Sequence, residues 1–371
     1  MKNNGRLLSL DVLRGLDLML LVGIQPVVRH FLIELDCQQL NDTLLYQLDH
    51  AQWEGMRIWD FVMPLFLFMS GVTMPYSLPK YKNSNGNLKV WSRIIKRFFL
   101  LFALGMVVQG NILSLDPDRV YIYSNTLQAI AVGYLLTVPM VLYLTPKWWL
   151  AVIAALLVIY SVPMHLLGDW SPQGNFACTV DKMILGRFRD GSSVTENGTI
   201  VFAQWYDYTW LWSSITFCCT VALGSLAGHI TKNGNRNRPA TAKRLYAMAV
   251  ILLVAGVLTG ELQPIIKRIW SASMVLYSAG WCYLLLAVFY WWIDVKGHSK
   301  GWDWLLYYGC NAITAYILGE TINFRCIASS VLHGTEQYIG EWYPVLMTAC
   351  NSIILFLILR ALYKAKLFLK V

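Results

Sequence analysis

His50 and Asp60 are the two residues whose types and spacing fit catalysis best. They lie in the stretch LDHAQWEGMRIWDFVMP, with Asp60 in the first turn of an apolar segment that is predicted to be helical. A carboxylate in such a segment is costly without a partner, and a buried carboxylate can hold an imidazole in one tautomer. We therefore predict a catalytic pair with Trp53 and Trp59 as apolar walls. Two plainer interpretations stay open, because Asp60 can cap its own helix and His50 can be a surface residue.

Further polar residues interrupt the apolar runs of the chain. Arg14 lies between Asp11 and Asp17 near the start of the first run, where it either joins an interfacial ion pair or meets an anionic ligand from the cytoplasm. Glu261 and Glu320 lie at or within apolar runs and could form a proton path. Amides in such runs often bind helices together, which is the plainer interpretation of Asn111, Asn125, Gln128, Gln263, Asn311 and Asn323.

The elements that must position these residues are membrane-spanning helices. Of 371 residues, 57% are hydrophobic and only 14% are charged, against about 25% charged in soluble domains. Runs of about 20 apolar residues are long enough to cross a bilayer. They fall at 15–33, 58–77, 94–113, 123–144, 148–165, 208–230, 245–262, 272–293, 303–323 and 342–362. The sequence therefore predicts one all-α polytopic domain over 1–371, with 1–231 and 245–371 as an alternative division about the linker-like segment 232–244.

The placement of positive charge predicts the orientation of these spans. The formal net charge is +9, and most Lys and Arg residues fall in alternate segments between the runs. Positively charged loops resist translocation, so both termini are predicted in the cytoplasm. No basic stripe with interleaved aromatic residues occurs, so a nucleic-acid partner is excluded. Two large loops, 34–57 and 166–207, then lie on the outer side, where we expect the recognition surface.

The cysteines do not indicate a metal site. The chain has eight, and none forms a CxxC pattern, so we predict no metal. Five of them lie in apolar runs and are predicted to be small core residues. Cys37, Cys178 and Cys326 lie in loops, where a disulfide could form but cannot be assigned.

The motifs around these residues resemble those of the transmembrane acyltransferases related to heparan-α-glucosaminide N-acetyltransferase. RLLSLDVLRG, from Arg6, is similar to the family's R-x-x-S-x-D-x-x-R-G opening, and DHAQWEGMRIWDFVMPLFLFMSGVTM is similar to its H-A-x-W-x-G and D-x-V-x-P-x-F blocks. Weaker similarities follow in TLQAIAVGY, GNFACTVDKMILG, LGSLAGHI, PIIKRIWSASMVLYSAG, DVKG and YGCNAITAY. The resemblance covers nearly the whole chain in order.

This resemblance implies an enzyme that moves the acetyl group of cytosolic acetyl-CoA to an amino sugar across the membrane. The family's active-site histidine falls on His50 and its nearby aspartate on Asp60. A polar position late in the first span, usually Asn in the family, falls on Gln25. The family's P-G-V-L-Q-R stretch is NTLQAIA here, which keeps Gln128 but replaces the arginine with Ala129.

The remaining site residues are candidates for binding. Cations near the cytoplasm suit the phosphates of acetyl-CoA, and Gln25, Asn125 or backbone amides could donate to the oxyanion of the reaction. The candidates for acetyl-CoA binding are Arg14, Gln25, Arg93, Lys96, Arg97, Asn125 and Gln128. The candidates for contact with the acceptor are Trp53, Trp270 and Asn311. The family's large luminal domain is not recognisable here, so the acceptor need not be heparan sulfate.

Two other functions stay open at this point. Asp60, Glu261 and Glu320 could serve a proton-coupled secondary transporter, although no paired interrupted helices are evident. An envelope-polysaccharide O-acyltransferase would use similar chemistry on a hydroxyl group. The first run holds no small-residue cleavage site, so we expect a multi-pass protein of a bacterial inner membrane, as a monomer or a homodimer.

Overall fold

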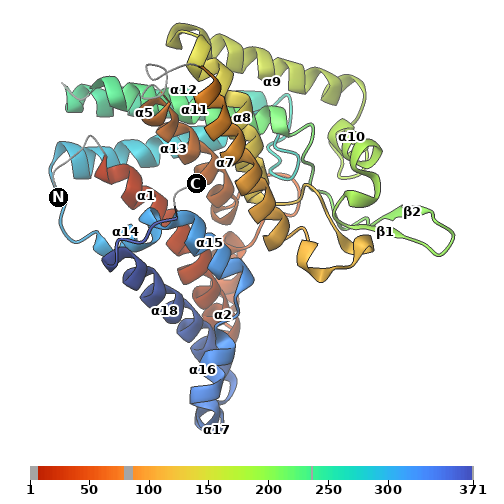
Figure 1. The fold of residues 1–371 in the computed structure, drawn as a ribbon, viewed down its shortest axis with the longest axis vertical. Helices are drawn as coiled ribbons and strands as arrows, with labels where there is room; N and C mark the ends of the chain where they lie inside the picture. Colours follow the sequence, from red (N-terminus) through yellow and green to blue (C-terminus); the bar gives the residue numbers. More distant parts are fainter. Residues whose placement is uncertain (1–6, 79–86, 235–236, 370–371) are drawn as a thin grey trace. The chain divides into compact units, whose positions relative to one another are not determined.

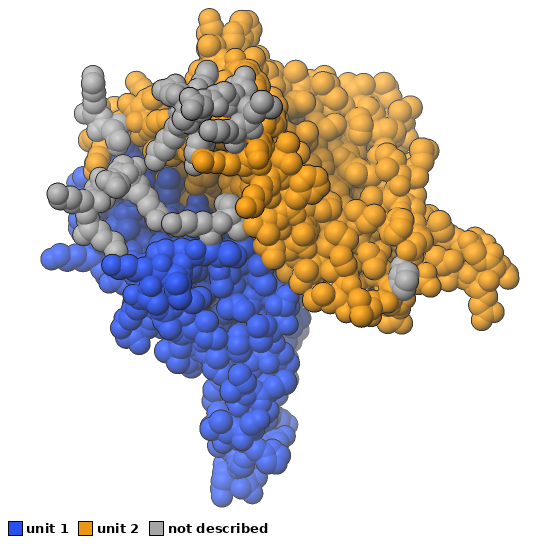
Figure 2. All heavy atoms as spheres, in the orientation of Figure 1, with its two compact units in different colours: residues 1–50, 57–62, 288–370 blue, residues 51–56, 63–287, 371 orange. Residues whose placement is uncertain are grey.

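The computed structural model describes residues 7–78, 87–234 and 237–369. They form two compact units, coloured separately in Figure 2. Unit 1 comprises the described residues within 1–50, 57–62 and 288–370, and unit 2 those within 51–56 and 63–287. His50 and Asp60 both belong to unit 1, whereas the segment of chain between them is divided between the two units.

Unit 1 is built around the first apolar run, which folds as one long helix with a wide turn. The helix α1 continues through the π-helical turn η1 into α2. Pro26 explains this turn, because proline lacks an N–H and its ring crowds the carbonyl one turn earlier. The helix α14 packs against α1 (Figure 1). Their backbones touch at two glycines, since a Cβ on Gly15 would overlap the carbonyl oxygen of Leu305, and one on Gly309 that of Asp11.

The elements of unit 1 are helical throughout its described residues. The helix α18 packs against α2, α14 and α16 within this unit. The elements are α1 (Leu8–Met19), η1 (Leu20–Ile24), α2 (Gln25–Leu35), α3 (Gln38–Leu40), η2 (Asn41–Leu45), α4 (Tyr46–Leu48), η3 (Ile58–Phe61), η9 (Tyr290–Val295), α14 (Asp303–Cys310), α15 (Ala312–Thr321), α16 (Arg325–Leu332), η10 (His333–Thr335), α17 (Glu336–Ile339), η11 (Gly340–Trp342) and α18 (Tyr343–Lys364).

Unit 2 is centred on α11, the most deeply buried of its apolar helices. The helices α8 and α9 pack on α11, and α7 packs on α8. Close packing of α5 on α11 requires glycine, because a Cβ on Gly224 would overlap the carbonyl oxygen of Phe68. The elements are α5 (Val62–Ser77), α7 (Asn87–Val108), η4 (Ile112–Ser114), η5 (Pro117–Arg119), α8 (Thr126–Tyr143), η6 (Pro146–Trp148), α9 (Trp149–Leu166), α10 (Phe176–Leu185), η7 (Gly186–Phe188), β1 (Ser192–Val194), β2 (Ile200–Phe202), α11 (Ser214–Asn233), α12 (Arg238–Gly260) and α13 (Ala272–Phe289).

The long loop 166–207, which was predicted on the outer side, has structure of its own. It contains α10 and a short antiparallel hairpin in which Ser192 pairs with Phe202. Asp181 of α10 accepts hydrogen bonds from the backbone N–H groups of Trp210 and Leu211, at 2.7 and 3.0 Å. This segment is therefore a folded element attached to unit 2 and not an irregular connection.

Eight helices in the described residues are long and apolar enough to cross a membrane, which confirms an all-α polytopic membrane protein. They coincide with eight of the ten predicted spans. The predicted span 94–113 corresponds to α7, whose first half carries Arg93, Lys96 and Arg97. The predicted span 303–323 is interrupted at Asn311 between α14 and α15. The number of crossings and the side of the termini stay predictions.

The cysteines form no disulfide. All eight lie in described residues, and none is joined to another in a disulfide bond. Cys178, expected in a loop, is buried in α10; Cys326 lies in α16, and Cys37 lies in the short connection between α2 and α3. No group of three His, Cys, Asp or Glu side chains among the described residues could hold a metal ion.

Candidate active site

The structure brings His50 and Asp60 together within unit 1. His50 Nδ1 lies 2.7 Å from Asp60 Oδ1, and the Asp60 side chain is only 1% exposed while that of His50 is 40% exposed. The second carboxylate oxygen, Oδ2, accepts the backbone N–H of Arg57 at 3.0 Å. Asp60 therefore caps its own helical turn with one oxygen and binds the imidazole with the other. The Trp59 ring centroid lies 6.3 Å from that of His50.

This geometry fixes which nitrogen of His50 can react. An ionised carboxylate accepts hydrogen bonds and cannot donate them. Asp60 therefore orients the imidazole with its proton on Nδ1, and Nε2 then carries the lone pair. An imidazole nitrogen with such a lone pair can take a proton from a substrate or attack an electrophilic carbon.

The helix α2 holds the chain just before His50. Gln25 Nε2 donates to the carbonyl oxygen of Leu48 at 3.1 Å. Arg29 Nε donates to Asp49 Oδ1, also at 3.1 Å. Gln25 and Arg29 are four residues apart and so lie on one face of α2. Gln25, predicted as a contact of the acyl group, is thus bonded to the backbone two residues before His50.

The residues before Asp60 hold the same segment from another side. Arg57 Nη1 donates to the carbonyl oxygen of Tyr46 at 3.2 Å, and its guanidinium carbon lies 3.6 Å from the centroid of the Tyr46 ring. The backbone N–H of Ile58 donates to Gln47 Oε1 at 3.2 Å. The sequence did not predict these contacts of Arg57 and Ile58, nor that of Arg29. A charged residue late in an apolar run, such as Arg29, was nevertheless a sign that it has a partner.

Two further candidates lie in unit 1. Arg14 Nη1 is 3.8 Å from Asp11 Oδ1 on the same face of α1, which fits the interfacial pair and leaves its role as an anion contact a prediction. Asn311 is 2% exposed and lies where α14 ends and α15 begins. Neither polar atom of its side chain has a hydrogen-bond partner among the described residues.

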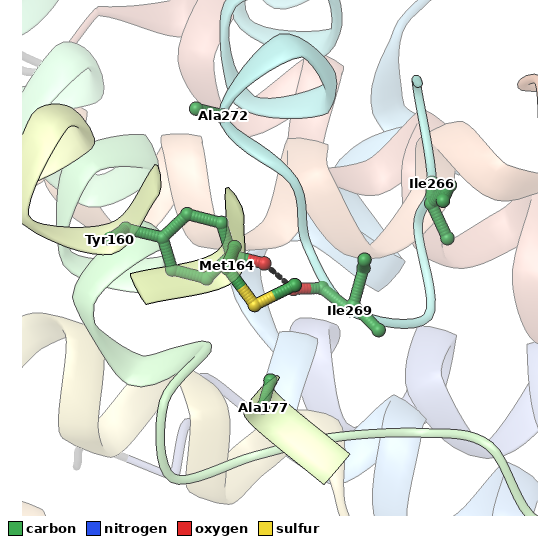
Figure 3. Close-up of a cluster of buried hydrophobic side chains, with 6 residues drawn as sticks. All are labelled: Tyr160, Met164, Ala177, Ile266, Ile269 and Ala272. Carbon is green, nitrogen blue, oxygen red and sulfur yellow. Dashed lines mark hydrogen bonds between the residues drawn. The ribbon is translucent and has the colours of Figure 1, made fainter. Parts of the chain in front are cut away.

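The two tryptophan candidates are packed within unit 2. Trp53 Nε1 donates to the carbonyl oxygen of Trp170 at 2.7 Å, and the Trp53 ring packs against the cluster of buried side chains drawn in Figure 3. In that cluster the Tyr160 hydroxyl donates to the carbonyl oxygen of Ile269 (Figure 3). Trp270 is 2% exposed and donates through Nε1 to Thr220 Oγ1 at 3.0 Å, as a core residue does.

Three cations of unit 2 share one face of α7. Arg93, Lys96 and Arg97 are spaced three and four residues apart. Arg93 and Lys96 are exposed, whereas the Arg97 guanidinium carbon lies 4.2 Å from the centroid of the Tyr134 ring on α8. A face of this kind suits phosphate groups, as predicted for acetyl-CoA.

Asn125 and Gln128 form the cap of α8 in unit 2. Asn125 Oδ1 accepts the backbone N–H of Leu127 at 2.7 Å, and Gln128 Oε1 accepts that of Asn125 at 3.1 Å. Gln128 Nε2 also donates to the carbonyl oxygen of Ile122. Both side chains are buried, so the structure uses them to start a helix.

Two buried charges, Asp181 and Arg189, lie in the segment 166–207 of unit 2. Burial raises the pKa of Asp181 to about 6, against the opposing effects of its two backbone hydrogen bonds and of Arg189. Arg189 is fully buried and donates to the carbonyl oxygen of Tyr206 at 2.9 Å. Burial also raises the pKa of Asp190. We therefore expect the stability of this segment to depend on pH.

Known proteins resemble the chain in the region that carries this site. The family model described as heparan-alpha-glucosaminide N-acetyltransferase, catalytic, matches residues 6–174. The heparan-alpha-glucosaminide N-acetyltransferase of Mus musculus is 25% identical over 419 residues, which cover 99% of this chain and 60% of the mouse protein. That of Homo sapiens is 24% identical over 367 residues, with 84% of this chain and 52% of the human protein covered.

The chain thus spans between half and two thirds of the length of these relatives. The matched residues include both His50 and Asp60 and the opening motif from Arg6. The resemblance predicted from the motifs is therefore confirmed: residues 6–174 are similar to the catalytic model of heparan-alpha-glucosaminide N-acetyltransferase, and the chain is similar to the mouse and human proteins of that name.

Proposed function

We propose that this protein transfers the acetyl group of acetyl-CoA to the amino group of a hexosamine or glycan on the far side of the membrane. The bond between His50 Nδ1 and the buried carboxylate of Asp60 is the observation that carries the proposal. A histidine so oriented is the central component of enzymes that transfer acyl groups. The names of the relatives support an N-acetyltransferase and an amino-sugar acceptor.

His50 Nε2 would act as the general base. It removes a proton from the acceptor ammonium, and the resulting amine attacks the thioester carbon to form a tetrahedral oxyanion. The imidazolium releases this first proton to solvent, and Nε2 takes the second proton from the nitrogen of the tetrahedral intermediate. The carbon–sulfur bond then breaks to leave the amide, and the imidazolium donates that second proton to the departing CoA thiolate. Asp60 stabilises the imidazolium between these two proton transfers.

The competing route makes His50 the nucleophile. Nε2 would attack the thioester carbon, release CoA and carry the acetyl group as acetyl-imidazole until the amine accepts it. We favour direct transfer, because a single acyl-transfer step needs no second intermediate. Rapid quenching with labelled acetyl-CoA and no acceptor separates the routes, since only the second route leaves label on His50.

The cations near the cytoplasmic side have a separate role in this proposal. Arg14, Arg93, Lys96 and Arg97 are the candidates for the phosphates of acetyl-CoA, and their contribution should weaken with salt. Trp53 and Asn311 stay the candidates for the acceptor. We also propose a bacterial inner membrane as the location of this multi-pass protein.

The test is an acetyl-transfer assay with the purified protein in liposomes. Radiolabelled acetyl-CoA is supplied with glucosamine, or with a matched sugar that has only hydroxyl groups, and the products are separated by charge. The proposal requires labelled N-acetylglucosamine that resists mild base. A base-labile product from the hydroxyl sugar alone would indicate an O-acyltransferase. Solute counterflow without either product would indicate a transporter.

A further inference from the structure

The five residues before and including His50 are each fixed by a different contact in unit 1. Tyr46 and Gln47 are bonded to Arg57 and to the backbone of Ile58. The contacts of the last three residues are those of Leu48 with Gln25, Asp49 with Arg29 and His50 with Asp60. The short helix α4 ends at Leu48, and Asp49 is extended, with φ −102° and ψ 159°. The segment thus leaves its helix one residue before the histidine.

Past this helix end no intrahelical hydrogen bond fixes the direction of the chain. The contact at Asp49 therefore decides how the backbone enters His50. Its partner, Arg29, comes from a long helix of the same unit, and its Nε lies 3.1 Å from Asp49 Oδ1. We propose that Arg29 is a positioning residue, which orients His50 by holding Asp49. This inference rests on the proposed role of His50.

Because this ion pair is exposed, its effect on the position of His50 can be measured separately from its effect on the stability of the protein. The side chains of Arg29 and Asp49 are 42% and 45% exposed. Ion pairs at such exposure contribute little to folding, so loss of the pair should leave the protein stable. A displacement of a catalytic group by about 1 Å, in contrast, lowers the rate about a hundredfold. A large loss of rate with little loss of stability is therefore the signature of this role.

The experiment is a charge exchange across the pair in the full chain. The variants are Arg29→Asp, Asp49→Arg and the double exchange, with Arg119→Ala as the matched control. Arg119 forms an ion pair with Asp116 at 3.3 Å in unit 2, also with exposed side chains. For each variant we measure kcat, KM for acetyl-CoA and the thermal midpoint. We also measure the rate at which diethyl pyrocarbonate modifies His50, read by mass spectrometry.

We expect each single exchange to lower kcat about tenfold to a hundredfold, with KM and the thermal midpoint unchanged. His50 should react faster with the reagent, because its segment is less restrained. The double exchange should restore most of the wild-type kcat and His50 reactivity, and Arg119→Ala should change neither kcat nor His50 reactivity. If both singles keep the wild-type kcat and His50 reactivity, or the double exchange is as impaired as the singles, the positioning role is wrong. Absence of acetyl transfer in the wild type would instead overturn the proposed function, while His50 reactivity would still decide the role of Arg29.

Discussion

Replacing Asp60 by asparagine tests the orientation of His50 most sharply. Asparagine has nearly the same shape, and its oxygen can still accept the N–H of Arg57. Its NH₂ group then faces His50 Nδ1, which becomes an acceptor at the position where the wild type has a 2.7 Å bond. The imidazole proton moves to Nε2, and the lone pair needed for the reaction is lost. Loss of the correct tautomer in comparable sites costs about 10⁴-fold in kcat.

The strength of the hydrogen bond between His50 and Asp60 gives a lower limit for the loss of kcat. A hydrogen bond to a charged group contributes about 1.5–3 kcal/mol, which corresponds to roughly 10-fold to 150-fold in rate. We therefore expect kcat of Asp60→Asn to fall by about 10-fold to 10⁴-fold, with KM for acetyl-CoA unchanged. The assay is acetyl transfer to glucosamine, and Asp303→Asn is the control, because Asp303 is an exposed carboxylate of the same unit. Turnover of Asp60→Asn at the rate of the control would refute the reasoning.

Three further predictions concern stability and donor binding. Gly224→Ala should lower the free energy of unfolding by about 1–3 kcal/mol, because the new Cβ overlaps the carbonyl oxygen of Phe68. Gly334→Ala is the control, since its Cβ meets open space. Equal thermal midpoints of the two variants would contradict this packing. The raised pKa of Asp181, about 6 against 3.8, contributes about 3 kcal/mol that is present at low pH and is lost as pH rises through 6. Thermal midpoints of Asp181→Asn should lack this dependence between pH 4 and 6. Arg14→Gln should weaken acetyl-CoA binding most at low salt; unchanged affinity by calorimetry would leave Arg14 an interfacial residue.

Hydropathy predicts much of this fold, because a membrane span needs a continuous apolar run that is visible in one dimension. The places where a helix changes type or breaks within an apolar run are harder to predict from the sequence. The π-helical turn before Pro26 has a local cause, but the break at Asn311 depends on how α14 and α15 pack. The structure of the loop 166–207 was also not predicted, because its helix α10 is short and is fixed by contacts from Asp181 to distant backbone groups.

The sequence predicted the candidate site only where a charged residue in an apolar segment required a partner. Asp60 needed a partner in an apolar segment, and the imidazole of His50 provides it. The contact of Arg29 with Asp49 depends on where α4 ends, and no residue near Leu48 predicts that helix end. Asn125 and Gln128 could have been interpreted better, because an Asn followed three residues later by Gln is the pattern of a helix cap.

The most direct measurement of the central claim is acetyl transfer by His50→Ala under conditions where acetyl-CoA binding is measured in the same sample. If the imidazole performs the chemistry, this variant binds acetyl-CoA as the wild type does and forms no N-acetylglucosamine above the uncatalysed rate. Product formation by His50→Ala at a rate close to that of the wild type would contradict the account.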